Sequence, residues 1–404
     1  MKGKGIVVGV TGGIAAYKAA ELVRLLVREE AVVRVAMTAN AARFVAPLTF
    51  EALSGNRILC DMWGPEAGAM DHISLGQEAD LVIVAPATAN FIGKMANGIG
   101  DDFLSTMLLA ATAPVLVCPA MNVKMYGNPV VQKNLEVLKD RGVTVMEPGE
   151  GQLACRSEGK GRLPDPPEIV EEAQRLLSPR DLQGMRILVT AGPTVEPLDP
   201  VRYITNRSSG KMGYAVARAA WRRGASVVLV SGPTCIAPPR GVDFKPVRTA
   251  FEMRDTVFAL APRTHVIVKA AAVADYRPKS TADQKIKKGP RALTLDLEKN
   301  PDILAELGKT DTFSGILVGF AAETEELLGN AEAKLKAKNL DMIVANDVSR
   351  KDAGFETDTN AVKILFREGR MEETPLLGKD QVADLLLDRI KVLWEDRGER
   401  RRGD

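Results

Sequence analysis

Histidine and cysteine are scarce in this sequence of 404 residues, which contains two histidines and four cysteines. No pair of them has the spacing of zinc ligands, and this argues strongly against a zinc module. The cysteines are also too few and too scattered for a disulfide scaffold. We therefore expect a protein of the reducing cytoplasm.

Long apolar runs and an excess of one charge are missing as well. The most apolar stretch, 106–121, is shorter than the ~20 residues that a membrane helix needs, and the first residues reach a glycine turn too early for a signal peptide. Lysine and arginine total 54 against 52 acids, so the net charge is +2. This balance argues against a general nucleic-acid or membrane-surface binder. We expect a soluble protein whose partners are small molecules.

Short apolar runs alternate with amphipathic helical stretches, a pattern typical of a parallel sheet covered on both faces. A strand at 6–10, a glycine turn, a helix over 15–29 and a strand over 32–37 begin the chain, and the same order restarts at Arg186. The sequence therefore predicts two doubly wound, Rossmann-like α/β domains with parallel sheets. We expect them over residues 1–180 and 181–404.

The remaining elements follow from the same reading. We expect further buried strands at 81–85, 115–118, 226–230, 265–273, 316–320 and 342–345. The segment 148–181 is rich in glycine, proline and charge, which indicates a mobile loop, a short helix at 168–177 and a linker. The charged residues 395–404 are expected to form a frayed, solvated tail.

Glycine turns between a strand and a helix carry the first chemical signal, because their N–H groups and the helix dipole favour an anion such as phosphate. Gly12 and Gly13 form such a turn, but without the spacing of the dinucleotide fingerprint or an acid at the end of the second strand. A purely structural turn is about as plausible from this segment alone. The second strand instead ends near Thr38, which offers a hydroxyl group.

The second half repeats this signal with more basic residues. Asn-Arg-Ser-Ser-Gly-Lys-Met-Gly at 206–213 is a polar glycine loop that opens a helix expected from Ser208 to about Arg223. Asp275 leaves a buried strand, Lys285 follows on a loop, and Lys334 and Lys338 are four apart on one helix face. Converging lysines suit a triphosphate, whose transfer depends on charge stabilisation. These residues indicate nucleotide binding but not which nucleotide.

Two segments of the first half, 85–102 and 119–126, resemble the flavin-dependent cysteine decarboxylase family. The loop at 206–213 is a specific match to phosphopantothenate–cysteine ligases. Essentially the whole chain resembles, in the same domain order, the bifunctional family of coenzyme A biosynthesis that joins phosphopantothenoylcysteine decarboxylase to that ligase. The chain has Tyr126 where this family often has tryptophan, an aromatic-for-aromatic change.

The resemblance implies a flavodoxin-like first domain that binds FMN. Oxidation of the substrate thiol to a thioaldehyde supplies the electron sink for loss of CO2, and the hydride is returned afterwards. Residues that would hold the flavin are Gly12, Gly13, Thr38, Ala87, Thr88 and Asn90. His72 would be the base, Asn122 would bind the substrate carboxylate, and Cys155 would protonate the enethiol.

For the second domain, the resemblance implies ligation of cysteine to 4′-phosphopantothenate through an acyl-cytidylate made from CTP with Mg2+. Residues that would bind CTP are Ala270, Ala271, Asp275, Pro301, Asp302, Ile303, Leu304, Phe320, Lys334 and Lys338. Lys285 would serve the activated phosphate, and Asn206 would position the acyl-cytidylate. The family also implies a homo-oligomer built from trimers of the first domain and dimers of the second, as in a dodecamer.

Each catalytic assignment has a plainer alternative. His72 could be a surface or capping residue, and Asn122 could only shape a turn. Cys155 lies in a polar loop beside an arginine, whereas Cys118 lies in an apolar run, so Cys155 is the better candidate for reactivity. We take Cys60 and Cys235 as structural.

Two other functions compete with the bifunctional enzyme. A flavin-carrying electron-transfer or regulatory protein would need neither Cys155 nor the lysines after Asp275. A nicotinamide-dependent reductase would need an acid for the ribose, which both halves lack.

Overall fold

The computed structural model describes residues 1–63, 68, 70–152, 158–288, 293–323, 327–347 and 357–403. The chain forms two compact units, Met1–Ser178 and Pro179–Asp404. All four clusters of buried apolar residues lie within one unit or the other. Each unit therefore has its own hydrophobic core among the described residues.

The first unit contains a five-stranded parallel sheet in the order β2-β1-β3-β4-β5. Its strands are β1 (Gly5–Val10), β2 (Val32–Met37), β3 (Leu81–Ala87), β4 (Val115–Pro119) and β5 (Thr144–Val145). Every residue of β3 is buried, because helices cover both faces of the sheet. This strand order is that of the flavodoxin-like fold.

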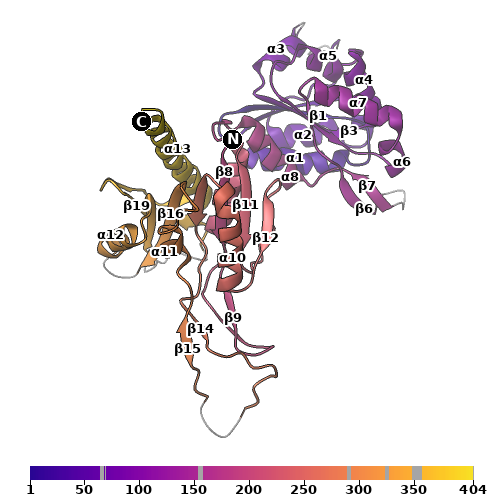
Figure 1. Ribbon diagram of the computed structural model, residues 1–404. Helices are drawn as coiled ribbons and strands as arrows, with labels where there is room; N and C mark the ends of the chain where they lie inside the picture. The colour runs from indigo at the N-terminus through magenta and orange to yellow at the C-terminus, as the bar shows by residue number, and fades with distance from the viewer. Residues whose placement is uncertain are drawn as a thin grey trace. The chain divides into compact units, whose positions relative to one another are not determined.

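Two helical layers enclose this sheet (Figure 1). One layer consists of α1 (Ala16–Arg28), α2 (Pro47–Ser54) and α8 (Pro166–Leu177). The other consists of α3 (Asp71–Glu78), α4 (Ala89–Asn97), α5 (Phe103–Ala110) and α7 (Pro129–Asp140). The short elements η1 (Ala41–Arg43) and α6 (Val123–Tyr126) and the hairpin of β6 (Gly149–Gln152) and β7 (Glu158–Arg162) complete the unit.

The second unit contains an eight-stranded sheet in the order β12-β11-β8-β13-β16-β17-β19-β20. Its strands are β8 (Arg186–Ala191), β11 (Ser226–Ser231), β12 (Asp243–Pro246), β13 (Val266–Lys269), β16 (Ile316–Glu323), β17 (Met342–Asp347), β19 (Val362–Phe366) and β20 (Met371–Glu373). The first six strands in this order are parallel, and β19 and β20 are antiparallel additions. The parallel part has the Rossmann order.

Helices cover both faces of the second sheet too. On one face lie α9 (Lys211–Arg222) and α13 (Lys379–Gly403), and on the other lie α10 (Ala250–Leu260), α11 (Ile303–Leu307) and α12 (Leu327–Ala337), with η2 (Ala261–Arg263) after α10. Three small ribbons pair β9 (Val195–Pro197) with β10 (Tyr203–Thr205), β14 (Tyr276–Pro278) with β15 (Leu297–Lys299), and β18 (Thr359–Asn360) with β21 (Leu377–Gly378). The β14–β15 ribbon projects from the unit (Figure 1).

The predicted fold class is confirmed, since both units are doubly wound around mainly parallel sheets. Two local predictions are wrong. Residues 149–152 and 158–162 pair as a hairpin where a loop was expected. The predicted frayed tail is the end of α13, because Arg397 is held by hydrogen bonds to Asp341, Ser314 and Gly315.

No helix in the described part of the chain is both long enough and apolar enough to cross a membrane.

Candidate functional site

The residues predicted to hold a flavin gather at the carboxyl ends of three neighbouring strands, β1, β2 and β3. Gly12 follows β1 and touches the loop after β2 so closely that an added Cβ would overlap Asn40. Thr38 lies in that loop, where its hydroxyl accepts a hydrogen bond from the N–H of Ala41 (3.3 Å). Glycine at position 12 is thus required for the two strand ends to meet.

The third strand end is joined to the first by a pair of threonines. The Thr11 hydroxyl donates to the carbonyl of Pro86 (2.7 Å) and accepts from the N–H of Thr88 (3.0 Å). The Thr88 hydroxyl in turn accepts from the N–H of Phe91 and caps α4, whose first turn carries the exposed Asn90. These contacts place Thr88 beside the glycine turn.

The residues at this edge fit the phosphate of a flavin mononucleotide. Helix α1 starts directly after the glycine turn, and its N-cap residue, Ala15, provides no side-chain hydrogen bond to the first turn. The N–H groups of a helix start need partners, and an anion supplies them.

The loop after β4 lies next to this edge and against the β6–β7 hairpin. The N–H of Ala120 donates to Ala87 O (3.0 Å), and the N–H of Met121 donates to Gly161 O (3.0 Å). A Cβ on Gly161 would overlap the carbonyl oxygen of Met121, so β7 packs directly on this loop. Asn122 follows in the loop, and its side chain accepts from the N–H of Lys124 (2.8 Å) and caps α6.

One predicted catalytic residue, His72, is not brought together with Asn122 here, and the position of another is not described. Cys155 belongs to 153–157, outside the described residues. His72 is half-buried on α3, which lies beside the outer edge of β2, where Arg34 pairs with Glu78 (3.2 Å). Asn122 follows β4, three strands further along, or roughly 14 Å at ~4.8 Å per strand.

The second unit has a cavity of about 290 Å3 at the carboxyl ends of its central strands. The predicted residues that line it are Asn206, Ala270, Ala271, Asp275, Leu304, Phe320, Lys334 and Lys338. They come from segments more than 130 residues apart in the sequence, so the cavity forms only in the folded unit.

One wall of the cavity is the segment that follows β13. The N–H groups of Ala270 and Ala271 donate to the backbone carbonyl and the hydroxyl of Thr190 (both 3.2 Å), and the N–H of Ala272 donates to Gly192 O (2.9 Å). These bonds turn the chain across the end of β8. For this reason β13 ends at Lys269, earlier than the predicted end at residue 273. Asn206 Nδ2 donates to Val273 O (3.1 Å) and holds the glycine loop beside this wall.

The glycine loop itself delays the start of α9. Gly210 has a φ of 76°, a conformation outside the helix, so α9 begins at Lys211 where Ser208 was predicted. An added Cβ on Gly213 would lie 2.6 Å from the Cβ of Ala191, so α9 packs tightly against the end of β8. The N-cap residue Gly210 gives no side-chain hydrogen bond, and α9 faces the cavity with an uncapped N-terminus.

Lys269 is a cavity residue that the sequence analysis missed. Burial lowers the pKa of Lys269 to about 8, and the charge of Lys338 acts in the same direction. Lys338 pairs with Asp302 (2.7 Å). Burial acts to raise the pKa of Asp302, but the hydrogen bonds from Lys338 and the N–H of Ala305, together with the charges of Lys338 and Lys269, outweigh it and the pKa is lowered. The missed signal was a lysine directly after the apolar residues 266–268.

Four predicted residues lie outside the cavity lining. Ile303 is buried in the core, Asp302 caps α11 through the N–H of Ala305 (3.1 Å), and Pro301 precedes them. Lys285 is exposed on a loop that is anchored where the N–H of Ile286 donates to Asp199 (3.1 Å). Their roles stay predictions.

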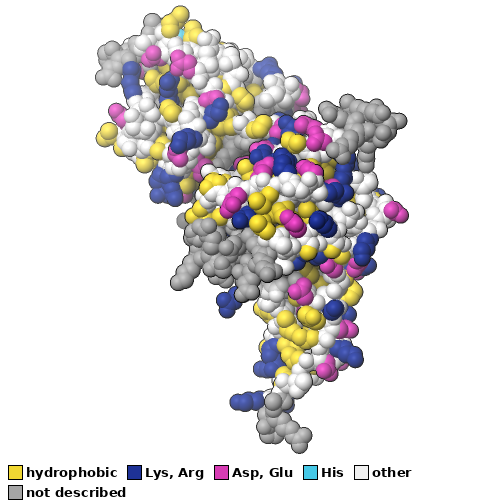
Figure 2. Space-filling view, turned by 90° about the vertical axis from the view of Figure 1, so that its left-hand side faces the viewer, with side chains coloured by type: hydrophobic (Ala, Val, Ile, Leu, Met, Phe, Trp, Pro, Cys, Tyr) yellow, Lys and Arg dark blue, Asp and Glu magenta, His cyan; other side chains and the backbone are white. Residues whose placement is uncertain are grey.

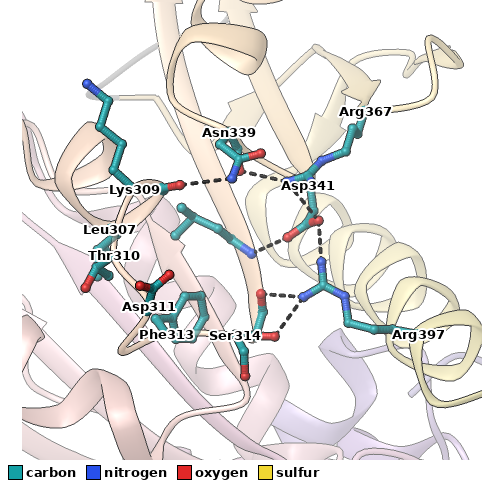
Figure 3. A pocket seen from close by; sticks show the side chains of 13 residues that line it. Leu307, Lys309, Thr310, Asp311, Phe313, Ser314, Asn339, Asp341, Arg367 and Arg397 are labelled. Carbon is teal, nitrogen blue, oxygen red and sulfur yellow. Dashed lines mark hydrogen bonds and ion pairs between the residues drawn. The ribbon is translucent and has the colours of Figure 1, made fainter. Parts of the chain in front are cut away.

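A larger pocket lies at the opposite edge of the sheet, where β16 and β17 begin (Figure 3). The two arginines of this pocket, Arg367 and Arg397, already form hydrogen bonds within the protein. Arg397 donates to Asp341 (2.6 Å) and to Ser314 O (3.1 Å), and Arg367 donates to Leu340 O (3.0 Å) and Asn339 O (2.7 Å). We call this group the Asp341 clasp and assign it a structural role.

Comparison with known proteins gives matches along nearly the whole chain. Residues 1–178 match the Flavoprotein family, and residues 182–393 match the family described as DNA/pantothenate metabolism flavoprotein C-terminal domain. The coenzyme A biosynthesis bifunctional protein CoaBC of Bacillus subtilis (strain 168) is 48% identical over 405 residues, 99% of this chain and 100% of that protein. The protein of the same name from Escherichia coli (strain K12) is 47% identical, with the same coverage.

Among solved structures, the crystal structure of the C-terminal domain of CoaBC is 43% identical and has a TM-score of 0.47. The match covers 54% of this chain and 99% of that one.

Proposed function

The chain belongs to the family of bifunctional coenzyme A biosynthesis proteins, and we propose that its two units divide the two reactions of that family between them. It is a phosphopantothenate–cysteine ligase and a phosphopantothenoylcysteine decarboxylase. The unit from residue 179 onward would perform the ligation, and the unit up to residue 178 would perform the decarboxylation. The product of the first reaction is the substrate of the second.

In the second unit, the nucleotide is CTP in our proposal. The carboxylate of 4′-phosphopantothenate attacks the α-phosphate and expels pyrophosphate, and the amine of cysteine then displaces CMP from the acyl-cytidylate. The observation that carries this proposal is the cavity, which eight of the predicted residues line. Lys334 reaches it from α12, Lys338 from the turn after that helix and Lys269 from β13, so positive charge would surround a triphosphate bound there.

Mg2+ would accompany the triphosphate. Asp275 is a carboxylate on the cavity wall that can contribute to holding the ion. Within the described ranges, no three His, Cys, Asp or Glu side chains cluster as metal ligands, which suits an ion held largely by substrate phosphates and water. Asn206, fixed by its bond to Val273 O, would position the acyl-cytidylate.

In the first unit, the cofactor is FMN in our proposal, held at the edge where β1, β2 and β3 end. A bound flavin would accept hydride from the substrate and return it once CO2 has left. The start of α1 and the residues Gly12, Gly13 and Thr88 would hold its phosphate. Asn122, placed by the cap of α6, would orient the carboxylate that is lost. Cys155 follows β6 in the chain, and β7 packs on the Asn122 loop, so we assign Cys155 the protonation of the enethiol.

The distance between His72 and Asn122 within one chain supports an oligomer. We propose that His72 of one copy serves the Asn122 loop of another, in trimers of the first unit. For the second unit we propose dimers formed through the β14–β15 ribbon, because apolar side chains gather along this projection (Figure 2). The exposed ones there include Tyr276, Leu293, Leu295 and Leu297.

Such a dimer would also give Lys285 a role. This lysine is exposed in the loop that connects β14 to β15 and does not line the cavity of its own unit. A partner ribbon could carry Lys285 to the activated phosphate. Trimers and dimers together would produce the dodecamer, and light scattering of the purified protein tests this mass. A cytoplasmic location is part of the same proposal, and cell fractionation tests it.

Mass spectrometry of the products from 4′-phosphopantothenate, cysteine and nucleotide tests the proposed function. With CTP we expect pyrophosphate, phosphopantothenoylcysteine and then 4′-phosphopantetheine, together with a flavin absorption spectrum of the purified protein. Pyrophosphate release with ATP but not with CTP would contradict the choice of nucleotide. A colourless protein that takes up no added FMN would contradict the assignment of the first unit.

A further inference from the structure

A second set of polar side chains reaches the ligase cavity from the other face of the sheet. Lys334 of α12 and Lys338, in the turn after that helix, lie on one face, whereas Lys211 and Lys379 stand at the starts of α9 and α13, which cover the opposite face. The cavity therefore has two cationic walls. A reaction that joins two phosphorylated substrates needs two such places.

Lys379 is the more buried lysine of the second wall, with 7% of its surface exposed. The β18–β21 ribbon leads directly into it, and its backbone N–H donates to Asp358 O (3.0 Å). Lys211 pairs with the Asp358 carboxylate (2.6 Å). Two lysines at helix starts on this wall, one of them mostly buried, suit an anionic ligand.

Two amides lie on the same wall. Asn346 and Asn360 line the cavity and are 8% and 2% exposed. Their side-chain oxygens are buried and accept no hydrogen bond from any residue that the structure describes. Buried acceptors are normally satisfied, and an O–H or N–H group of a ligand would satisfy these two.

We propose that Lys379, Asn346 and Asn360 bind the phosphate-bearing end of a ligase substrate. Lys379 Nζ and the N–H groups of the first turn of α9 hold the phosphate, and the two amide oxygens accept hydrogen bonds from the hydroxyl or amide groups of the same substrate. This inference rests on the ligase function proposed above. The phosphate is either the 4′-phosphate of the acid or part of the nucleotide triphosphate. The cationic α12 wall, to which we assign the nucleotide, favours the 4′-phosphate.

The test compares KM values in the full-length protein, measured by pyrophosphate release. Lys379→Met removes the charge and keeps most of the apolar stem. We expect its KM for 4′-phosphopantothenate to rise by about tenfold or more, the usual size for a lost charged hydrogen bond, while its KM for CTP changes less than about twofold. The preference for 4′-phosphopantothenate over pantothenate should fall by a similar factor. Lys245→Met, at an exposed lysine on β12, is the matched control and should leave both KM values unchanged.

Other results of this KM comparison would change the ligand that we assign to the site or overturn the inference. A rise confined to the KM for CTP keeps the phosphate site and identifies the triphosphate as its ligand. Unchanged KM values and unchanged discrimination against pantothenate overturn the inference. Urea unfolding followed by the fluorescence of Trp221 and Trp394, which belong to the second unit, reports whether the variant is folded. Asn360→Ala is the second variant, and it should raise the same KM with Lys379 present.

A pH profile separates binding from a structural role. Burial lowers the pKa of Lys379 to about 8; the nearby charge of Lys211 acts in the same direction, and Asp358 opposes it. The other charged groups around Lys379, Arg218 and Asp380, line the adjoining cavity. The wild-type KM should therefore rise as the pH increases through 8, and Lys379→Arg, which stays charged, should reduce that rise to the part contributed by Lys269, whose pKa is also about 8. An identical rise in Lys379→Arg contradicts the inference.

Failure of this inference differs from failure of the proposed function. A wild-type protein that releases no pyrophosphate from CTP in the presence of 4′-phosphopantothenate contradicts the ligase assignment itself. A wild-type protein that releases pyrophosphate, together with a Lys379→Met variant whose KM values are unchanged, contradicts only the role of Lys379.

Discussion

Lys269, in the cavity of the second unit, is a side chain whose buried positive charge lowers the stability of the fold. Its pKa is about 8 in the folded protein, against an ordinary value of 10.5, because burial disfavours the ammonium form. Below pH 8 both the folded and the unfolded chain carry the proton, and folding bears the full cost of burying it. Between about pH 8 and 10.5 only the unfolded chain carries it, so this cost decreases as the pH rises.

We predict that Lys269→Met raises the free energy of unfolding of the second unit at pH 7 by about 1–3 kcal/mol and lowers ligase activity. The gain in stability should fall to about half at pH 9.5. Urea unfolding followed by tryptophan fluorescence measures it, since Trp221 and Trp394 both belong to this unit. An equal gain at pH 7 and at pH 9.5 would show that charge is not the cause.

Lysines also mark the limit of what the sequence could predict about the sites. Lys334 and Lys338 were predicted together from their spacing of four, and both line the cavity, although α12 ends at Ala337 and Lys338 lies in the turn after it. Lys269 left a weaker signal, a charge ending an apolar strand. Lys379 left none, because the β18–β21 ribbon brings it to a cavity whose other residues lie up to 173 positions earlier in the chain.

Among the small elements, the β6–β7 hairpin contacts the loop that contains Asn122, and its two strands flank Cys155 in the sequence. Gly161 of β7 touches the backbone of Met121, one residue before Asn122. The segment after Gln152 contains Cys155. Since Cys155 lies between β6 and β7 in the sequence, we expect the position of the hairpin to affect the distance between two of the proposed catalytic groups.

We predict that Gly161→Ala lowers the decarboxylation rate by at least about tenfold, because the new methyl group pushes β7 away from Met121. Ligase activity should not change. The matched control is Gly149→Ala in the same hairpin, where the nearest atom to the added Cβ is 3.7 Å away. CO2 release from phosphopantothenoylcysteine measures the effect, and equal rates for the two variants would contradict this role of the hairpin.

The C-terminal helix is held at its far end by the Asp341 clasp. Asp341 is 10% exposed in its side chain, accepts from the N–H of Leu317 (2.8 Å) and pairs with both Arg367 and Arg397. Composition predicted a frayed tail here. That prediction was wrong because the partners of Arg397 are backbone carbonyls 82 and 83 residues earlier, which no local pattern reveals.

We predict that Arg397→Ala lowers the free energy of unfolding of the second unit by about 1–3 kcal/mol, since it leaves a half-satisfied carboxylate and two carbonyls without their donor. Glu395→Ala, which loses only an exposed pair with Lys391 (3.8 Å), should cost less than about 0.5 kcal/mol. The same tryptophan signal measures both variants. Similar losses in the two would argue that the clasp does not stabilise the unit.

Strand positions were the most predictable feature of the whole molecule, because strands buried on both faces read as apolar runs. The strand predicted at 32–37 is β2 residue for residue. What could not be predicted comes from contacts distant in sequence. An example is the set of hydrogen bonds that the N–H groups of residues 270–272 donate to Thr190 and Gly192, which end β13 early.

At this largest scale, we predict that cleavage between Ser178 and Pro179 leaves two folded proteins with one reaction each. Each unit contains complete apolar clusters, so neither depends on the other for its core. The fragment from residue 179 should release pyrophosphate from CTP, and the fragment up to residue 178 should bind flavin and release CO2. Loss of both activities on separation would show that the units need one another.

The packing of α13 has a consequence for how the chain is made. Leu386, Leu387 and Ile390 of this last helix complete the apolar cluster that also contains Val189 of β8. The second unit cannot finish its core until the ribosome has translated Ile390, which lies 212 positions after the end of the first unit at Ser178. At about 5–20 residues per second, the first unit has roughly 10–45 s to fold while the second unit is still emerging. Premature termination anywhere in α13 would then release a chain with a finished flavoprotein and an unfinished ligase, a product that proteases would recognise.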